Sequence, residues 1–205
     1  MMSAQETNFG QTPSQTVGPY FAYGLTGSQY RYDFDQPFDD VVAYPHAEGQ
    51  HILLQGRVFD GDGALIPDAM IEIHQADSQG EYAPRTDNPA AEGRRKGFRG
   101  FGRVGTGTDP DARYWFRTVK PAAAAPGDAP RIDMIVLMRG ILVHAFTRVY
   151  FSDEAAANAK DPTLQLVPAE RRDTLVAQRS EVGGEVVYTF DIHMQGEKET
   201  VFFDV

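Results

Sequence analysis

Arg131, Asp133 and Arg139 are charged residues in a segment whose pattern otherwise predicts a buried strand. Alternation over residues 131–139 predicts one wholly apolar face, made of Ile132, Met134, Val136 and Met138. The opposite face is apolar in its middle and charged at both ends. A strand with one solvated face carries polar residues all along that face. We therefore expect the three charged groups to meet other protein groups or a ligand.

Other residue types that could do chemistry form no evident catalytic set. The five histidines form neither a His-x-His nor a His-x-x-x-His pair, spacings at which two imidazoles can meet one metal. Asp191 and His193 share one face of a predicted strand and could bind a metal, although a solvated face is the simpler interpretation. Residues 100–105 resemble a dinucleotide-binding loop in their glycines alone, because no helix pattern follows them.

The composition excludes several classes of protein. The chain has 205 residues, no cysteine and a formal net charge of −10. Missing cysteines exclude disulfides and thiolate metal sites, and the negative charge argues against a nucleic-acid partner. The polar first residues lack the apolar core of a signal peptide, and no segment approaches the roughly 20 apolar residues of a membrane span. We expect a soluble, cytoplasmic protein with no membrane partner.

Short apolar runs separated by glycine and proline predict an all-β fold. Strands are expected at residues 51–60, 69–76, 114–119, 131–139, 141–151, 174–181, 185–193 and 200–205. One short helix is expected after Ser152, which could cap it, with its end at Asp161-Pro162, and a second after Pro168. The pattern favours a β-sandwich of mixed sheets over residues 51–205. Residues 1–50 are expected to form an irregular N-terminal arm that packs on the sandwich and on a partner subunit.

Several motifs in order along the chain resemble the intradiol ring-cleaving dioxygenases. They begin with TPSQTVGPY at residues 12–20 and continue with LLQGRVFDGDGALIPDAMIEIHQADSQGEY, FRGFGRVGTGTD, YWFRTVKP, APRIDMIVLMRG and TRVYFSDEAAANAKDP. The ending QGEKETVFFDV is also similar. Each motif alone is modest, but together they cover nearly the whole chain. The resemblance implies an intradiol dioxygenase-like sandwich.

The resemblance also implies an iron site that this chain has lost. The family's catalytic subunit binds Fe(III) through two tyrosines and two histidines. Tyr82 keeps the position of the first tyrosine, but residues 122–129 contain no second tyrosine, and Arg131 and Asp133 occupy the histidine positions. An arginine cannot bind a cation. We expect Tyr82, Arg131 and Asp133 to form a degenerate iron site held by charge and hydrogen bonds, the alternative being that Arg131 points to solvent.

The resemblance therefore implies a noncatalytic subunit with no metal ligand and no catalytic residue of its own. Fe(III) is expected in a partner beta subunit, and this chain completes the shared pocket for 3,4-dihydroxybenzoate and O2. The substrate-binding residues implied are Thr16, Gly18, Pro19, Tyr20 and Arg139. An arginine suits the substrate carboxylate. Tyr20 could instead be an aromatic interface anchor, and Arg139 an intrachain ion pair.

Two other functions compete with this interpretation. The first is a stand-alone β-sandwich module that binds small aromatic anions. The second is an active homo-oligomeric dioxygenase, which the missing ligands argue against, because Fe(III) needs anionic oxygen and imidazole ligands.

Overall fold

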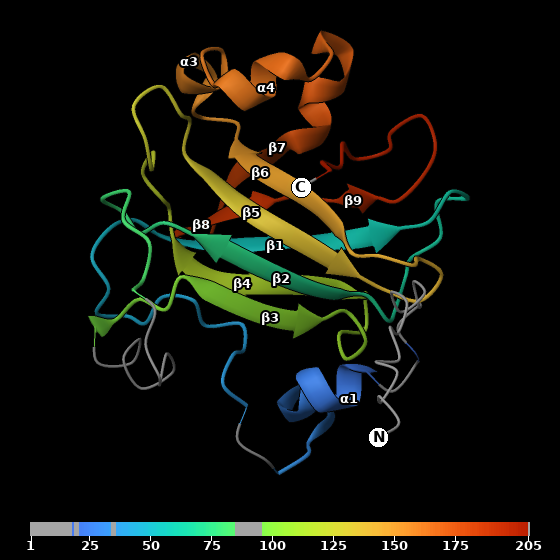
Figure 1. The fold of residues 1–205 in the computed structure, drawn as a ribbon. Helices are drawn as coiled ribbons and strands as arrows, with labels where there is room; N and C mark the ends of the chain where they lie inside the picture. Colours follow the sequence, from blue (N-terminus) through green and yellow to red (C-terminus); the bar gives the residue numbers. More distant parts are fainter. Residues whose placement is uncertain (1–17, 19–20, 34–35, 85–95, 205) are drawn as a thin grey trace, which may run out of the picture.

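Two layers of strands enclose the apolar core of the protein (Figure 1). The structure is a computed structural model and describes residue 18 and residues 21–33, 36–84 and 96–204. Its strands within these residues are β1 His51–Phe59, β2 Met70–Gln75, β3 Phe101–Gly105, β4 Arg113–Val119, β5 Arg131–Leu137, β6 Ala145–Phe151, β7 Val176–Val182, β8 Glu185–Thr189 and β9 Ile192–His193.

The strand order is β3-β2-β5-β6-β7-β8-β1-β4, and β9 pairs with β1. The first four strands make one layer and the last four the other, joined where β6 runs parallel to β7 at Tyr150–Val176 and Phe151–Ala177. β1 also runs parallel to β8, whereas β2, β5 and β6 pair antiparallel. The expected β-sandwich of mixed sheets is confirmed.

β5 lies in the middle of its layer, between β2 and β6 (Figure 1). Ile132, Met134 and Val136 are fully buried in the core between the layers, as their alternation predicts. Burying each such side chain contributes roughly 1.5–3 kcal/mol. The core side therefore fixes the register of β5, and with it the positions of the charged residues at both ends.

Five short helices lie outside the sheets in the described residues. They are α1 Phe21–Leu25, η1 Gly27–Tyr30, α3 Ala155–Asn158, α4 Pro162–Leu166 and η2 Ala169–Leu175. The expected cap at Ser152 is wrong, because α3 begins after Glu154. The expected end at Asp161-Pro162 is also only a boundary between helices: Asp161 caps α4, and Pro162 is its first residue.

Three further expectations differ from the structure. Residues 141–144 are not part of β6, because the chain turns after Gly140, whose φ is +90°. Residues 200–204 form no strand, and Phe203 makes an isolated bridge with Phe146. The glycine-rich residues 101–105 form β3, which the sequence pattern did not predict.

The segment expected to be an arm contributes to the core. Val42 is fully buried there, and the N–H groups of Val42 and Ala43 both donate to the carbonyl of Arg117 in β4. No helix within the described residues is long and apolar enough to cross a membrane.

Candidate functional site

Arg131 and Asp133 belong to a compact group of charges at the start of β5. Arg131 Nη1 donates to Asp128 Oδ2 at 2.7 Å, and its Nε lies 3.6 Å from Asp133 Oδ1. The same Asp133 oxygen lies 3.3 Å from the Nε of Arg148, which faces Asp133 across the β5–β6 pair. Two arginines and two aspartates thus balance each other in side chains that are 15–21% exposed.

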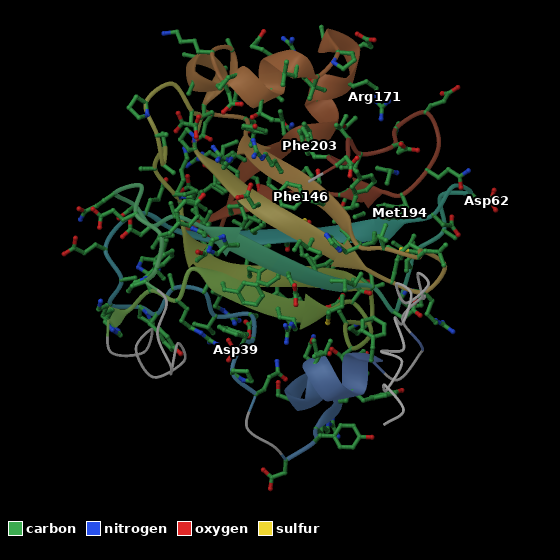
Figure 2. The ribbon with its side chains drawn as sticks, viewed as in Figure 1. Asp39, Asp62, Phe146, Arg171, Met194 and Phe203 are labelled. Carbon is green, nitrogen blue, oxygen red and sulfur yellow. The ribbon has the colours of Figure 1, made fainter. Side chains whose placement is uncertain are left out.

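Each arginine in this group has a second support. Burial alone would lower the pKa of Arg131, but the hydrogen bond to Asp128 and the charge of Asp133 raise it overall. Arg148 donates to the Thr163 hydroxyl at 2.7 Å, and its guanidinium lies 5.6 Å from the ring centre of Phe203. Phe203 in turn packs beside Phe146, with ring centres 6.4 Å apart (Figure 2).

Tyr82 lies at the edge of this group. Its ring stacks on His74, with ring centres 4.9 Å apart and an angle of 20° between planes, and His74 pairs with Asp133 across β2 and β5. Burial raises the pKa of the Tyr82 hydroxyl, the charge of Asp133 raises it further, and Arg131 and Arg148 oppose this only in part. These surroundings therefore disfavour the ionised form of the phenol, which is the form that binds a metal.

These residues do not fit an Fe(III) ion. Arg131 places a positive charge where the family resemblance implies a histidine ligand. The Asp133 carboxylate is already shared between two guanidinium groups. Within residues 18, 21–33, 36–84 and 96–204, no three His, Cys, Asp or Glu side chains gather closely enough to hold a metal ion. At the positions where the family resemblance implies histidine ligands, the structure has a cluster of paired charges.

A cavity of about 460 Å³ opens beside Tyr82. Its lining includes His46, Glu48, Glu81, Lys96 and Phe98 but not Arg131 or Asp133. The charge cluster therefore does not present free ionic groups to this cavity, and we assign it no ligand.

Arg139 lies beyond the opposite end of β5. β5 runs from Arg131 to Leu137, six steps of about 3.3 Å each, so its two ends lie about 20 Å apart, and Arg139 follows two residues later. The Arg139 side chain is 56% exposed, and its Nε donates to the Asp68 carboxylate. The intrachain ion pair considered from the sequence is therefore present. Arg139 cannot act at the degenerate iron site of its own chain.

The N-terminal helices lie at the Arg139 end of the sheet. Tyr30 of η1 places its hydroxyl against Gly107, where a Cβ would also come within 2.9 Å of the Pro67 carbonyl. Gln29 binds the end of β3 through two hydrogen bonds: its Oε1 accepts from the Gly105 N–H at 2.7 Å, and its Nε2 donates to the Gly105 carbonyl at 3.0 Å. Gln29 and Tyr30 of the arm are thus fixed at the end of β3, close to Asp68.

Of the predicted pocket residues in the arm, the structure describes only Gly18. Gly18 is exposed, and its carbonyl accepts a hydrogen bond from the Phe21 N–H at 3.3 Å. Thr16, Pro19 and Tyr20 lie outside the described residues. Their role in substrate binding stays a prediction.

Sequence reasoning missed four residues around these sites: Asp128, Arg148, His74 and Asp68. Strand pairing, which is known only from the structure, brings three of them to these sites. In the antiparallel β2–β5 pair His74 opposes Asp133, and the Asp68–Arg139 ion pair lies just beyond the last paired residues, Met70 and Leu137. Arg148 opposes Asp133 in the β5–β6 pair.

Comparison with known proteins places the chain in a family. A family model described as dioxygenase matches residues 18–196. The chain belongs to the intradiol ring-cleavage dioxygenase family.

Its relatives narrow this class. The chain is 58% identical over 200 residues to the protocatechuate 3,4-dioxygenase alpha chain of Burkholderia cepacia, covering 97% of this chain and 100% of that one. It is 31% identical over 162 residues to the protocatechuate 3,4-dioxygenase beta chain of the same organism, covering 74% of this chain and 67% of that one. Identity to the alpha chain is thus much higher and extends over nearly the whole length.

A solved structure has the same fold. The dioxygenase domain of a dioxygenase carbohydrate-binding protein fusion from Streptomyces sp. SirexAA-E superimposes with a TM-score of 0.55 at 21% identity, covering 89% of this chain and 96% of that one. At this identity the likeness concerns the fold alone.

Proposed function

We propose that the chain is the noncatalytic alpha subunit of a protocatechuate 3,4-dioxygenase. The proposal rests on the 58% sequence identity to a protocatechuate 3,4-dioxygenase alpha chain, which extends over nearly the whole length of this chain. In this proposal a beta subunit holds Fe(III), and the assembly cleaves the ring of 3,4-dihydroxybenzoate with O2 to 3-carboxy-cis,cis-muconate, a step of aromatic catabolism in the beta-ketoadipate pathway. The cysteine-free composition suits the cytoplasm, where we place the assembly.

The proposed roles of the two subunits are supported by the residues at the two ends of β5. At its start, Arg131 and Asp133 fill the position of a metal with balanced charges, so this chain supplies no metal ligand. Beyond its end, Arg139 is exposed on a turn, where a guanidinium can reach a ligand outside its own chain. We propose that Arg139, with Thr16, Gly18, Pro19 and Tyr20 of the arm, borders the pocket of the beta subunit.

The physical role of Arg139 is to bind the substrate carboxylate. That carboxylate lies on the ring opposite the two hydroxyl groups, and an arginine can bind it with charge-assisted hydrogen bonds. The arm contributes to the shape of the pocket. Gly18 allows the backbone to approach the substrate closely, and Pro19 fixes the direction of the chain.

The proposal includes a division of the chain into two parts. Residues 1–50 would serve as the arm that packs on the sandwich and on the partner, and residues 51–205 as the dioxygenase-like sandwich. Among the described residues of the arm, η1 packs on β3 through Gln29, which supports the first half of this assignment.

The test is co-purification with activity. A tagged copy of this chain should retain an untagged protocatechuate 3,4-dioxygenase beta chain, and ring cleavage of 3,4-dihydroxybenzoate should require both chains. Ring cleavage by this chain alone with added iron would contradict the proposal. Binding of aromatic acids by this chain with no capture of the beta chain would favour a stand-alone binding module.

A further inference from the structure

Asp68 lies between Arg139 and Tyr30 of the N-terminal arm. β2 pairs with β5 at Met70–Leu137 and with β3 at Met70–Gly105, both antiparallel. Asp68 lies in the turn just before β2, and its carboxylate forms an ion pair with Arg139, which lies in the turn just after β5. Gly107 lies in the turn just after β3. Gly107 is the residue that Tyr30 covers.

Asp68 is the partner that fixes the Arg139 side chain. Arg139 Nε donates to Asp68 Oδ2, and among the described residues Asp68 is the one side chain to which Arg139 is hydrogen-bonded. A guanidinium has five N–H donors in a planar fork, so a contact at Nε leaves the four terminal N–H groups available. The Asp68 side chain is 29% exposed, and the backbone next to it is fixed because the Ala69 N–H donates to Thr106 Oγ1 at 3.1 Å.

An arginine whose side chain is already fixed by another residue binds a carboxylate more tightly than an arginine whose side chain is mobile. An exposed arginine loses rotamer freedom when it binds a ligand, and that entropy cost falls if another residue already fixes the side chain. Because Asp68 contacts Nε, it can impose this order without occupying the terminal nitrogens that form paired hydrogen bonds to a carboxylate.

We propose that Asp68 is a positioning residue for substrate recognition, which holds Arg139 so that its terminal nitrogens can bind the carboxylate of an aromatic acid in the partner's pocket. This inference rests on the proposed function. It predicts that Asp68 matters for substrates that carry a carboxylate and does not matter for those that lack one.

The experiment compares two substrates in the reconstituted complex with the beta chain. Asp68→Ala should raise the KM for 3,4-dihydroxybenzoate about threefold to tenfold with kcat changed less than about twofold. The KM for catechol, which has the same hydroxyl pair and no carboxylate, should not change. Asp68→Asn keeps an acceptor oxygen for Arg139 Nε, and its KM should lie between those of the wild type and Asp68→Ala. The substrate Kd, measured without O2, should follow the KM.

Two further variants separate positioning from a structural effect. In an Arg139→Ala background, Asp68→Ala should cause no additional rise in KM, because Asp68 acts through Arg139. Asp62→Ala removes an exposed aspartate from the same β1–β2 connection (Figure 2), and it should leave both KM values unchanged.

Failure of the inference and failure of the proposed function give different results. If Arg139→Ala raises the KM for 3,4-dihydroxybenzoate but Asp68→Ala does not, the positioning role is overturned and the proposed function stands. The positioning role is also overturned if Asp68→Ala raises the KM equally for both substrates, or if it raises the KM further in the Arg139→Ala background. If Arg139→Ala has no effect, the roles of both Arg139 and Asp68 are overturned, but the assignment as an alpha subunit stands. If no active complex forms with the wild-type chain, the proposed function is overturned as well.

Discussion

Asp133 Oδ1 lies 3.3 Å from Arg148 Nε, and the two residues face each other across β5 and β6. The same oxygen lies 3.6 Å from Arg131 Nε. Neither Nε–H makes an aligned hydrogen bond within the described residues, so these contacts are chiefly electrostatic. The Asp133 carboxylate is thus shared by two largely buried cations, with Asp128 as a second partner of Arg131, at the position where the family resemblance implies a metal.

Removing this carboxylate should destabilise the protein. Asp133→Ala leaves Arg148 without its charge partner and leaves Arg131 with Asp128 alone, so we expect the free energy of unfolding to fall by about 1–3 kcal/mol. Urea unfolding at pH 7 measures the change. Asp62→Ala, at an exposed turn, should change it by less than about 0.5 kcal/mol. Equal stabilities for Asp133→Ala and the wild type would show that the cluster does not compensate buried charge.

Protonation of Asp161 should lower the stability of the protein in acid. Burial alone would raise the pKa of Asp161, but N–H groups of Ala129 and Leu164 at 2.9 and 2.8 Å, with the Tyr150 hydroxyl at 3.0 Å, lower it below 3.8. The stability from the ionised form is therefore fully present above about pH 4, and it is lost as the pH falls through the lowered pKa.

The variant Asp161→Asn isolates this charge, because asparagine is also a good helix cap. We expect it to be less stable than the wild type by about 1–2 kcal/mol at pH 7, measured by urea unfolding. The difference should shrink as the pH is lowered below 4. A difference that stays constant with pH would mean that the carboxylate charge contributes nothing.

Gln29 should hold the arm on the sandwich. Gln29→Ala removes both hydrogen bonds to Gly105, so we expect faster amide hydrogen exchange at Gly105 and a loss of about 1 kcal/mol in stability. Gln29→Glu keeps an acceptor for the Gly105 N–H and should preserve its protection. The core amide of Ile71 should exchange equally slowly in all three proteins. Unchanged exchange at Gly105 in Gln29→Ala would show that the arm is held elsewhere.

The sequence was most informative where burial alternates. The apolar face of β5 is buried as predicted, because a shift of one residue would expose Ile132, Met134 and Val136 together. The apolar residues after Gly140 resemble a strand, so the sequence pattern could not show that residues 141–144 form a loop instead of the start of β6. β3 was missed because two of its five residues are glycines, which lower strand propensity. Here Gly102 is required by the close approach of Val42 and Phe116.

The charged residues show a second limit. The family resemblance suggested a link between Arg131 and Asp133, but the contacts with Arg148, and of Arg139 with Asp68, depend on which strands are neighbours and in what register. Neither is readable from one chain's pattern. The separation of the degenerate site from Arg139 likewise follows from the length of β5.

The iron content of this chain, alone and in complex with a protocatechuate 3,4-dioxygenase beta chain, tests the central claim most directly. After incubation with iron and gel filtration, this chain alone should retain none, and the complex should hold one iron for each pair of chains. Stoichiometric iron on the isolated chain would contradict the account, because Arg131 and the ion-paired Asp133 would then have failed to exclude a metal.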